Sequence, residues 1–233
     1  YVFTEYQPNQ FKNCHELVQF MDIGIAETEI NGKLQSSIAN IPNYCFYNCE
    51  SITHYVWRWD NGRDVSDPTP ITIGNYAFYG CKSLTHLDAH KAVTSIGSHA
   101  FENSSVDGNS FVFLYHNMYN WFQVDQNAYT LRPFPTGGES VFAGDENLVT
   151  IDIPLGYHDY TSGDTPIQET YEFPTGVGMY ENCKNLTTIT FHPFFNGVPE
   201  FENSTLVFPS VIPERCFKGT NLDSATINYI LTF

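Results

Sequence analysis

The sequence predicts a solenoid rich in β-strand, and three observations support this prediction. A hexapeptide, Ile73-Gly-Asn-Tyr-Ala-Phe78, returns as Ile96-Gly-Ser-His-Ala-Phe101, 23 residues further along the chain. Between the two copies, residues 84–89 show the apolar-x-x-apolar-x-apolar pattern of a short strand. Aromatic residues in the same local context recur along most of the chain. Repetition at a period of about 20–50 residues indicates units that bury their apolar faces by stacking on one another.

The stretch from Ile71 to Phe101 resembles the BspA-like leucine-rich repeat. Its residues Ile73 to Leu87 read Ile-Gly-x-x-Ala-Phe-x-Gly-Cys-x-x-Leu-Thr-x-Leu, and looser copies follow along most of the chain. The resemblance implies a leucine-rich-repeat solenoid. It also implies a surface protein, in which the chain is an extracellular or cell-surface adhesin-type module that binds protein or glycan.

The repeats can be aligned on the aromatic residue of the Ala-Phe motif, which we call the anchor. Successive anchors are separated by 35, 32, 23, 41, 38 and 37 residues, so most repeats carry an insertion. This spacing predicts about seven irregular repeats in one solenoid over residues 1–233. Neither end carries a polar cap, so we expect a segment of a longer protein or a chain whose ends are covered by partners. The anchors are Phe11, Phe46, Phe78, Phe101, Phe142, Tyr180 and Phe217.

Each repeat is expected to form a short helical turn, a tight loop, a short strand and a return. The residue two positions after each anchor is Asn or Gly, which tolerate left-handed backbone and let the turn reverse. The strands should stack as one parallel sheet on one face, with Leu84 and Leu87 inward and His54 and His86 in one exposed column. The predicted strands are 17–20, 52–57, 84–89, 111–115, 148–153, 186–191 and a degenerate 222–227.

Four of the six cysteines lie three residues after an anchor. Their strand-to-strand spacing overlaps that of a disulfide, so a bridge is geometrically possible. We favour buried reduced thiols, and we interpret Cys45 and Cys216 as small core residues. Since no Cys-x-x-Cys pair occurs, a structural zinc site is not expected. The aligned cysteines are Cys14, Cys49, Cys81 and Cys183.

The composition excludes some classes of partner. Acidic residues number 26 against 10 basic ones, which gives a formal net charge of −16. Nucleic acids and anionic membrane surfaces require clustered Lys and Arg, so neither is expected. An apolar run of about 20 residues, long enough to span a bilayer, does not occur in the sequence. The charge fits a solvated surface, cation binding or a basic partner.

Aromatic residues exceed what the core needs, with 15 Tyr, 19 Phe and 3 Trp. Many lie in the insertions, which follow the strands and should emerge along one edge of the solenoid. Aromatic and Arg side chains dominate the energetics of interfaces, and Tyr and Trp faces also stack on sugars. We therefore predict a binding surface for protein or glycan made by Trp57, Arg58, Trp59, Arg63, Tyr115, Tyr119, Trp121, Phe122, Tyr157, Tyr160 and Tyr171.

Two other functions remain open. The loops and ends could join copies of the chain in a filament or surface layer. A carbohydrate-active enzyme would need paired carboxylates, for which Asp88 and Asp152 are the candidates. We favour neither, and we predict no catalytic residue and no cofactor.

A few residues have the chemistry for metal binding or glycan attachment. His54, His86 and Asp88 could surround a metal, but two repeats supply no closed ligand set, so we interpret them as a solvated face and predict no metal site. The segment 60–64 reads first as a turn rather than a calcium loop. Sequons occur at Asn103, Asn185 and Asn203, which matter only in a secreted eukaryotic protein.

Overall fold

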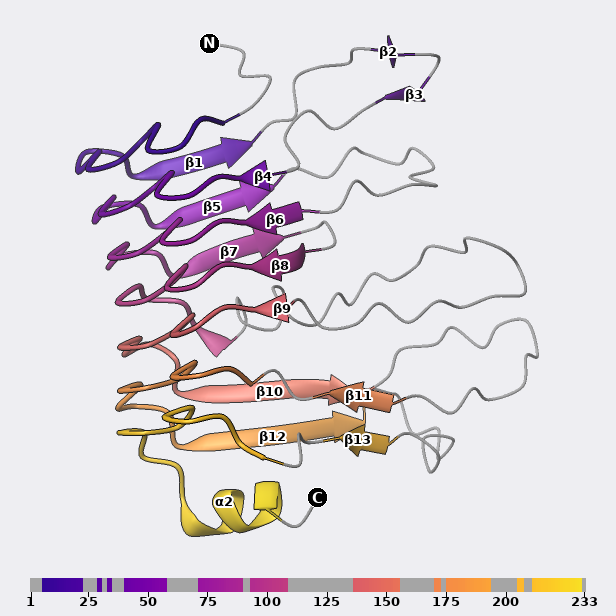
Figure 1. Ribbon diagram of the computed structural model, residues 1–233. Coiled ribbons are helices and arrows are strands. Elements are labelled where there is room, and N and C mark those ends of the chain that lie inside the picture. The colour runs from indigo at the N-terminus through magenta and orange to yellow at the C-terminus, as the bar shows by residue number, and fades with distance from the viewer. Residues whose placement is uncertain are drawn as a thin grey trace.

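The computed structural model stacks turns and short strands along one axis, from the N-terminal repeat to a C-terminal helix (Figure 1). In its described part, no helix has the length and apolar character needed to cross a bilayer. The residues that the structure describes are 6–22, 29–30, 33–34, 40–57, 71–89, 93–108, 136–155, 170–172, 175–193, 205–207 and 211–231.

The predicted strands form parallel pairs in the predicted register. Gln19 pairs with His54 and His54 with His86, as the alignment on the anchors requires. Leu84 and Leu87 are fully buried, whereas His54 and His86 are exposed. The strands are β1 (Gln19–Asp22), β5 (His54–Trp57) and β7 (His86–Ala89) in one sheet, and β10 (Thr150–Leu155) with β12 (Thr188–Pro193) in another. The predicted strand 111–115 lies outside the described residues.

The structure has a second set of parallel strands, which the prediction of a sheet on one face did not include. These strands come from the return segments that precede the turns, where β-branched residues such as Ile71, Thr72 and Ile73 favour extended backbone. They are β4 (Asn40–Ile41), β6 (Ile71–Ile73), β8 (Val93–Ile96) and β9 (Thr136–Gly137) in one sheet, and β11 (Thr170–Glu172) with β13 (Thr205–Val207) in another. The short strands β2 (Glu29–Ile30) and β3 (Lys33–Leu34) pair antiparallel.

The anchors form one continuous stack of aromatic rings through the core. Adjacent ring centroids lie 5.0 to 6.1 Å apart, and adjacent planes are within 14° of parallel. The five anchors from Phe46 to Tyr180 are fully buried. Each of these rings is shared by the repeats before and after it, so the predicted anchor alignment is confirmed.

The turns are not helical, which corrects the expectation of short helical turns. Every second backbone N–H group bonds to the next repeat, such as Tyr44 N to Asn75 O at 3.0 Å and Phe46 N to Ala77 O at 2.8 Å, while the N–H groups between them bond within their own turn. Such bonds require N–H groups that alternate in direction, which the left-handed residues on both sides of each anchor provide. The turn segments thus form a further hydrogen-bonded layer along the solenoid.

The cysteines after the anchors are free, and most bond to the preceding repeat. Cys49 Sγ donates to Phe11 O at 2.9 Å, Cys81 Sγ to Phe46 O at 3.2 Å and Cys183 Sγ to Phe142 O at 3.0 Å. Burial raises the pKa of the Cys49 thiol to about 11 and that of Cys183 to about 12. Buried reduced thiols are therefore confirmed for these three. Cys14, in the first repeat, is exposed, so the prediction is wrong there.

Asp145 stands where the fifth repeat would have its cysteine. Its carboxylate is fully buried and accepts hydrogen bonds from Val106 N at 2.8 Å, Asn147 N at 2.9 Å and Ser104 Oγ at 3.3 Å. Burial raises the pKa of Asp145 to about 8, although these hydrogen bonds act in the opposite direction. The Asp145 side chain therefore accepts hydrogen bonds from loop N–H groups, whereas the cysteines of other repeats donate to an anchor carbonyl. Cys45 and Cys216 are buried, as predicted for core residues.

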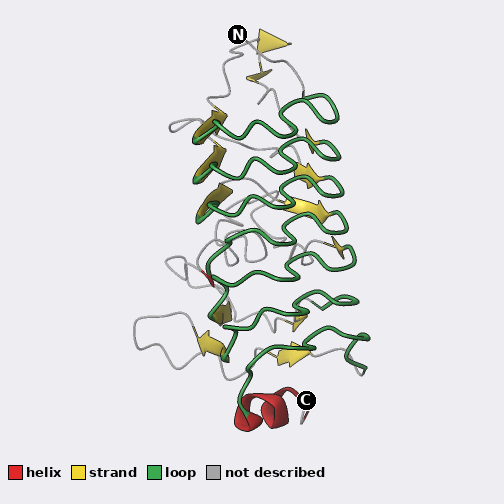
Figure 2. Cartoon of the chain, turned by 90° about the vertical axis from the view of Figure 1, so that its left-hand side faces the viewer, coloured by secondary structure: helices red, strands yellow, loops and turns green. Residues whose placement is uncertain are grey.

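The C-terminal segment is a helix, α2 (Ser224–Leu231), where the sequence predicted a degenerate strand. Asp223 Oδ1 accepts a hydrogen bond from Thr226 N at 2.6 Å, the geometry of an N-cap. This cap satisfies a free N–H of the first turn, so it favours helix over strand at this point. The helix lies at the end of the strand stack (Figures 1 and 2).

Candidate functional site

The turns form one continuous surface, on the left in Figure 1 and facing the viewer in Figure 2. We call it the turn face. It is defined by the side chains two positions before and one position after each anchor. Two positions before lie Asn9, Tyr44, Tyr76, His99, Ser140, Gly178 and Arg215, and one position after lie Lys12, Tyr47, Tyr79, Glu102, Ala143, Glu181 and Lys218.

The backbone of the turn face needs left-handed residues at two positions of every repeat. Two positions after the anchor, φ lies between 55° and 77° and the residue is always Asn or Gly. Two positions before it, the backbone is equally left-handed, yet Tyr44 (φ 59°), Tyr76 (φ 56°), His99 (φ 59°) and Arg215 (φ 60°) occupy it. A bulky residue in this conformation costs about 1–2 kcal/mol. Strain of this kind points to side chains kept for another purpose.

The first repeats place a patch of tyrosines on the turn face, which we call the tyrosine patch (Tyr44, Tyr47, Tyr76 and Tyr79). Tyr44 stacks on Tyr76 with centroids 5.0 Å apart, and Tyr47 stacks on Tyr79 at 4.9 Å. Lys12 Nζ lies 5.4 Å and 5.0 Å from the centroids of Tyr44 and Tyr47. Tyr44 and Tyr47 each lie between Lys12 and another tyrosine, so these half-exposed rings offer their edges to a partner.

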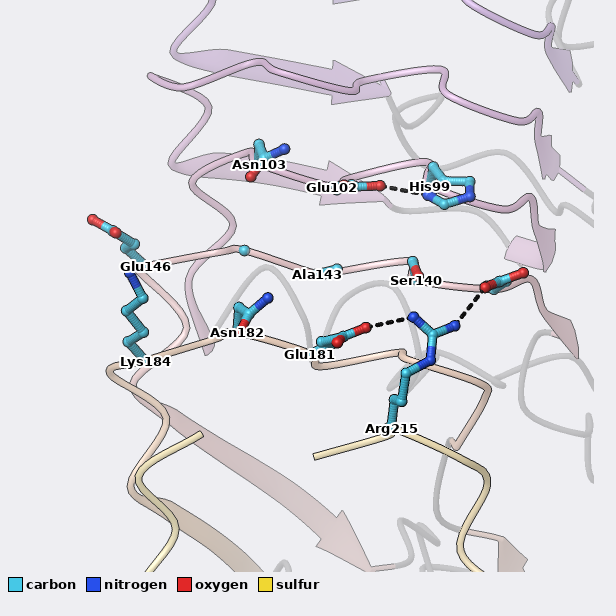
Figure 3. A pocket seen from close by; sticks show the side chains of 12 residues that line it. His99, Glu102, Asn103, Ser140, Ala143, Glu146, Glu181, Asn182, Lys184 and Arg215 are labelled. Atoms are coloured by element: carbon cyan, nitrogen blue, oxygen red, sulfur yellow. Dashed lines mark hydrogen bonds and ion pairs between the residues drawn. The ribbon is translucent and has the colours of Figure 1, made fainter. Parts of the chain in front are cut away.

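Beyond the tyrosine patch the turn face has a hollow of about 520 Å³ (Figure 3). Small residues create it, since Ser140, Ala143 and Gly178 occupy positions where other repeats carry large side chains. His99 and Glu102 line the hollow from one repeat, and Glu181 and Arg215 from repeats further along. Polar groups from four successive repeats therefore face the same space.

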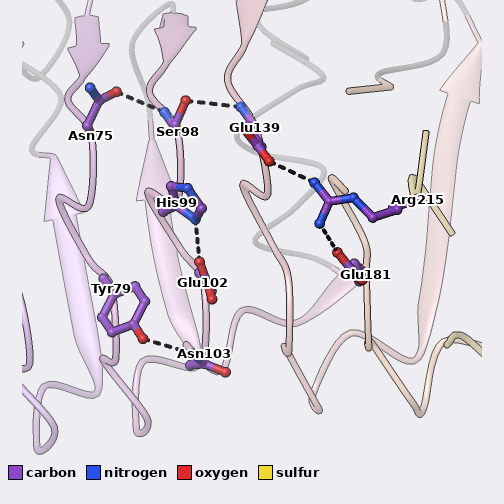
Figure 4. Close-up of polar contacts among 9 residues, drawn as sticks. All are labelled: Asn75, Tyr79, Ser98, His99, Glu102, Asn103, Glu139, Glu181 and Arg215. Carbon is purple, nitrogen blue, oxygen red and sulfur yellow. Dashed lines mark hydrogen bonds and ion pairs between the residues drawn. The ribbon is translucent and has the colours of Figure 1, made fainter. Parts of the chain in front are cut away.

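On the side of the hollow away from His99, Arg215 forms ion pairs with Glu139 and Glu181 (Figure 4). Its Nη1 donates to Glu181 Oε2 at 2.8 Å, and its Nη2 donates to Glu139 Oε1 at 2.8 Å. Lys218 Nζ donates to Glu181 Oε1 at 3.0 Å. The hydrogen bond from Lys218 is the main cause that lowers the pKa of Glu181, and the bond to Glu139 is the main cause that raises the pKa of Arg215.

The near side of the hollow carries an imidazole–carboxylate pair. His99 Nδ1 is hydrogen-bonded to Glu102 Oε2, and the His99 ring stacks on Tyr76 with centroids 4.6 Å apart. A hydrolase would also need a nucleophile within hydrogen-bond reach of the ring. Ser140 is the nearest candidate by position, but within the described residues no hydrogen bond joins it to His99. In the described part of the chain, this pair thus has an orienting carboxylate but no hydrogen-bonded nucleophile.

The predicted binding residues fall mostly outside the described part of the chain. Trp57 ends β5, and Tyr171 lies in β11. Asp88 and Asp152 belong to strands of different sheets, β7 and β10, and the hollow is not lined by either. Asn103 and Asn185 are exposed. The segment 60–64 and Asn203 lie outside the described residues, as do Arg58, Trp59, Arg63, Tyr115, Tyr119, Trp121, Phe122, Tyr157 and Tyr160.

The turn face was not predicted from the sequence, although one signal for it was present. The anchors Phe46 and Phe78 are both framed as Tyr-x-Phe-Tyr, in Tyr44 to Tyr47 and in Tyr76 to Tyr79. Once the anchors are aligned, this repetition places tyrosines at equal positions in neighbouring repeats. The hollow leaves a weaker signal in the sequence, because it depends on small side chains in one repeat that lie between repeats with large side chains.

A comparison with known protein families identifies the repeats of this chain. The family described as BspA type leucine-rich repeat region matches in six copies, over residues 3–58 and 65–156. No curated protein and no solved structure matched the chain. The anchor stack continues past the matched residues through Tyr180 and Phe217, whose ring centroids are 5.3 Å apart. The matched ranges cover more than half of the chain, which therefore belongs to the BspA-type leucine-rich repeat family.

Proposed function

We propose that this chain is a non-enzymatic recognition module that binds a protein partner through its turn face. Proteins of this family are commonly surface adhesion or recognition modules and are typically non-enzymatic. The observation that carries the proposal is the contrast between two left-handed positions. One always holds Asn or Gly, whereas the other holds Tyr44, Tyr76, His99 and Arg215 against the preference of the backbone.

The arrangement of the tyrosines favours a protein ligand over a glycan. Sugars bind to aromatic residues through open ring faces, but Tyr44 lies between Lys12 and Tyr76, and Tyr76 lies between Tyr44 and His99. Ring edges and hydroxyl groups remain, and these suit the mixed apolar and polar contacts of a protein interface. Leucine-rich repeat domains generally mediate protein binding.

The charge of the chain favours a basic contact surface on that partner. The hollow is lined by Glu102, Glu139, Glu146 and Glu181 against Lys184 and Arg215, and the formal net charge of the whole chain is −16. Long-range attraction of this sign accelerates association with a basic surface and weakens with salt. We propose a surface or extracellular location, in keeping with the family.

The aromatic insertions remain a proposed second surface, since they lie largely outside the described residues. Trp121→Ala is expected to weaken partner binding without lowering stability. Assembly of copies into a filament or surface layer remains the alternative function. It would appear as concentration-dependent growth of the purified chain in light scattering, whereas the recognition function requires a stable small species.

The turn face can be tested with arrays of immobilised peptides and of glycans probed by the labelled chain. We expect binding to basic peptides, and we expect the double variant Tyr76→Asn/His99→Asn to lose it. Asn accepts left-handed backbone, so this variant should stay folded. Gln19→Asn, an exposed change on β1, is the matched control. Binding that survives the double variant, or binding to glycans alone, would overturn the proposal.

A further inference from the structure

The exposed face of the β1-β5-β7 sheet brings two histidines together, away from the turn face. His54 in β5 and His86 in β7 are direct partners in the parallel register. Their ring centroids lie 5.1 Å apart with planes inclined by 43°, and both side chains are exposed. Two imidazoles at this separation can reach one ion between them, because metal–nitrogen bonds are about 2.0–2.1 Å long.

A neighbouring hydroxyl lies within hydrogen-bond distance of one ring nitrogen of His54. Thr53 Oγ1 donates its only proton to Val18 O at 3.1 Å. The same oxygen lies 2.9 Å from His54 Nδ1, so with the hydroxyl proton on Val18 O it can accept a hydrogen bond from a protonated Nδ1. The neutral ring then has an unprotonated Nε2. This is the arrangement by which outer-sphere groups orient histidines that bind metals.

We propose that His54 and His86 together bind one divalent first-row transition-metal ion, through Nε2 of His54 and a ring nitrogen of His86. Imidazole suits Cu²⁺, Ni²⁺ and Zn²⁺, and the general order of affinities places Cu²⁺ first. Within the described residues, no group of three or more His, Cys, Asp or Glu side chains could hold a metal ion, so the proposal assigns two protein ligands and leaves the other positions to water. Mg²⁺ and Ca²⁺ prefer oxygen ligands and should not compete.

This site differs from the interpretation drawn from the sequence, which treated the two histidines as a solvated face. The new observations are the direct pairing of the rings and the contact of Thr53 Oγ1 with His54 Nδ1. The proposal does not depend on the turn face, since none of its residues belongs to it. The two can therefore fail separately.

The test is calorimetric titration of the purified chain with CuCl₂, NiCl₂ or ZnCl₂ alone in a buffer that does not chelate. Cys14 carries an exposed thiol that would also bind these ions, so all proteins in the comparison carry Cys14→Ser. We expect one ion per chain, and His54→Asn and His86→Asn should each weaken binding by roughly tenfold or more. His15→Asn, a change at another exposed histidine, is the matched control and should bind normally.

Two further measurements separate a site from scattered surface binding. Substoichiometric Cu²⁺ should broaden the ring NMR signals of His54 and His86 together before those of other histidines. Thr53→Val should keep the fold but release the tautomer, which the ring ¹⁵N shifts of His54 report, and should weaken binding. Equal broadening of all histidines, or unchanged affinity in both Asn variants, would overturn the proposal.

Discussion

Arg215 reaches past a complete repeat to bond with Glu139, 76 residues earlier in the chain, at 2.8 Å. Gly178 occupies the equivalent position in the repeat between them. A Cβ atom on Gly178 would lie 2.9 Å from Ser140 Oγ and 3.8 Å from Arg215 Nη2, so any longer side chain would meet the guanidinium. The missing side chain thus lets one arginine join three repeats through Glu139 and Glu181.

Gly178→Asn is expected to separate Arg215 from Glu139 without unfolding the chain. Asn accepts positive φ, and Asn9 occupies the same position in the first repeat. The Arg215 Nε–H signal in ¹H–¹⁵N NMR should shift and exchange faster with water. Glu139→Gln, which keeps an acceptor but removes the charge, is the control and should perturb the signal less. An unchanged signal in Gly178→Asn would show that the guanidinium does not depend on the empty position.

Phe78→Ala is expected to lower the free energy of unfolding by roughly 3–5 kcal/mol, the usual range for a buried Phe. The Phe78 ring is fully buried and stacks on Phe46 and Phe101, with centroids 5.1 Å and 5.2 Å away. Urea unfolding followed by circular dichroism measures the change. Phe217→Ala, at the half-buried end of the stack, should lose less. A loss below about 1 kcal/mol in Phe78→Ala would contradict the role of the anchor stack.

Asp145 is expected to make stability fall as the pH rises from about 4 to 8. Burial raises its folded pKa from 3.8 to about 8, so over this range the folded chain holds a proton that the unfolded chain has lost. The unfolded state binds fewer protons there, and the linkage relation then makes stability decrease with pH, by at most roughly 1.4 kcal/mol per pH unit.

The measurement for Asp145 is urea unfolding at pH 5 and at pH 8, in the wild type and in Asp145→Asn. Asn keeps a carbonyl acceptor for Val106 N or Asn147 N and does not titrate. The wild type should lose more stability between the two pH values than the variant does. Equal losses in both proteins would show that another group causes the pH dependence.

Thiol reactivity should distinguish one cysteine from the other five. Cys14 is exposed, whereas the remaining cysteines are buried, and burial raises the pKa of Cys45 to about 12 and that of Cys216 to about 11. The thiolate is the reactive form, so burial and a raised pKa both protect a cysteine from modification. Ellman's reagent should therefore modify one thiol in the native protein and six after denaturation. Cys14→Ser should abolish the native reaction; rapid modification of several thiols would contradict the packed column.

The anchors, the strand register and the buried cysteine column could all be predicted from the chain alone. Each depends on local spacing, such as the three residues from Phe78 to Cys81, and a local pattern survives insertions between repeats. The helix α2 was mistaken for a strand because Leu222, Ala225 and Ile227 mimic the strand pattern. Its N-cap at Asp223 was the competing signal.

The sequence by itself determined which residues enter the core and in which order the repeats stack, because apolar periodicity and burial are coupled in every repeat. Only the tertiary structure decided what the surface of the turns became. Tyr44 stacks on Tyr76, and Arg215 forms an ion pair with Glu139, although the insertions make the sequence separations between such partners unequal. Their left-handed backbone also depends on hydrogen bonds to the next repeat, and such bonds are invisible until the repeats are stacked.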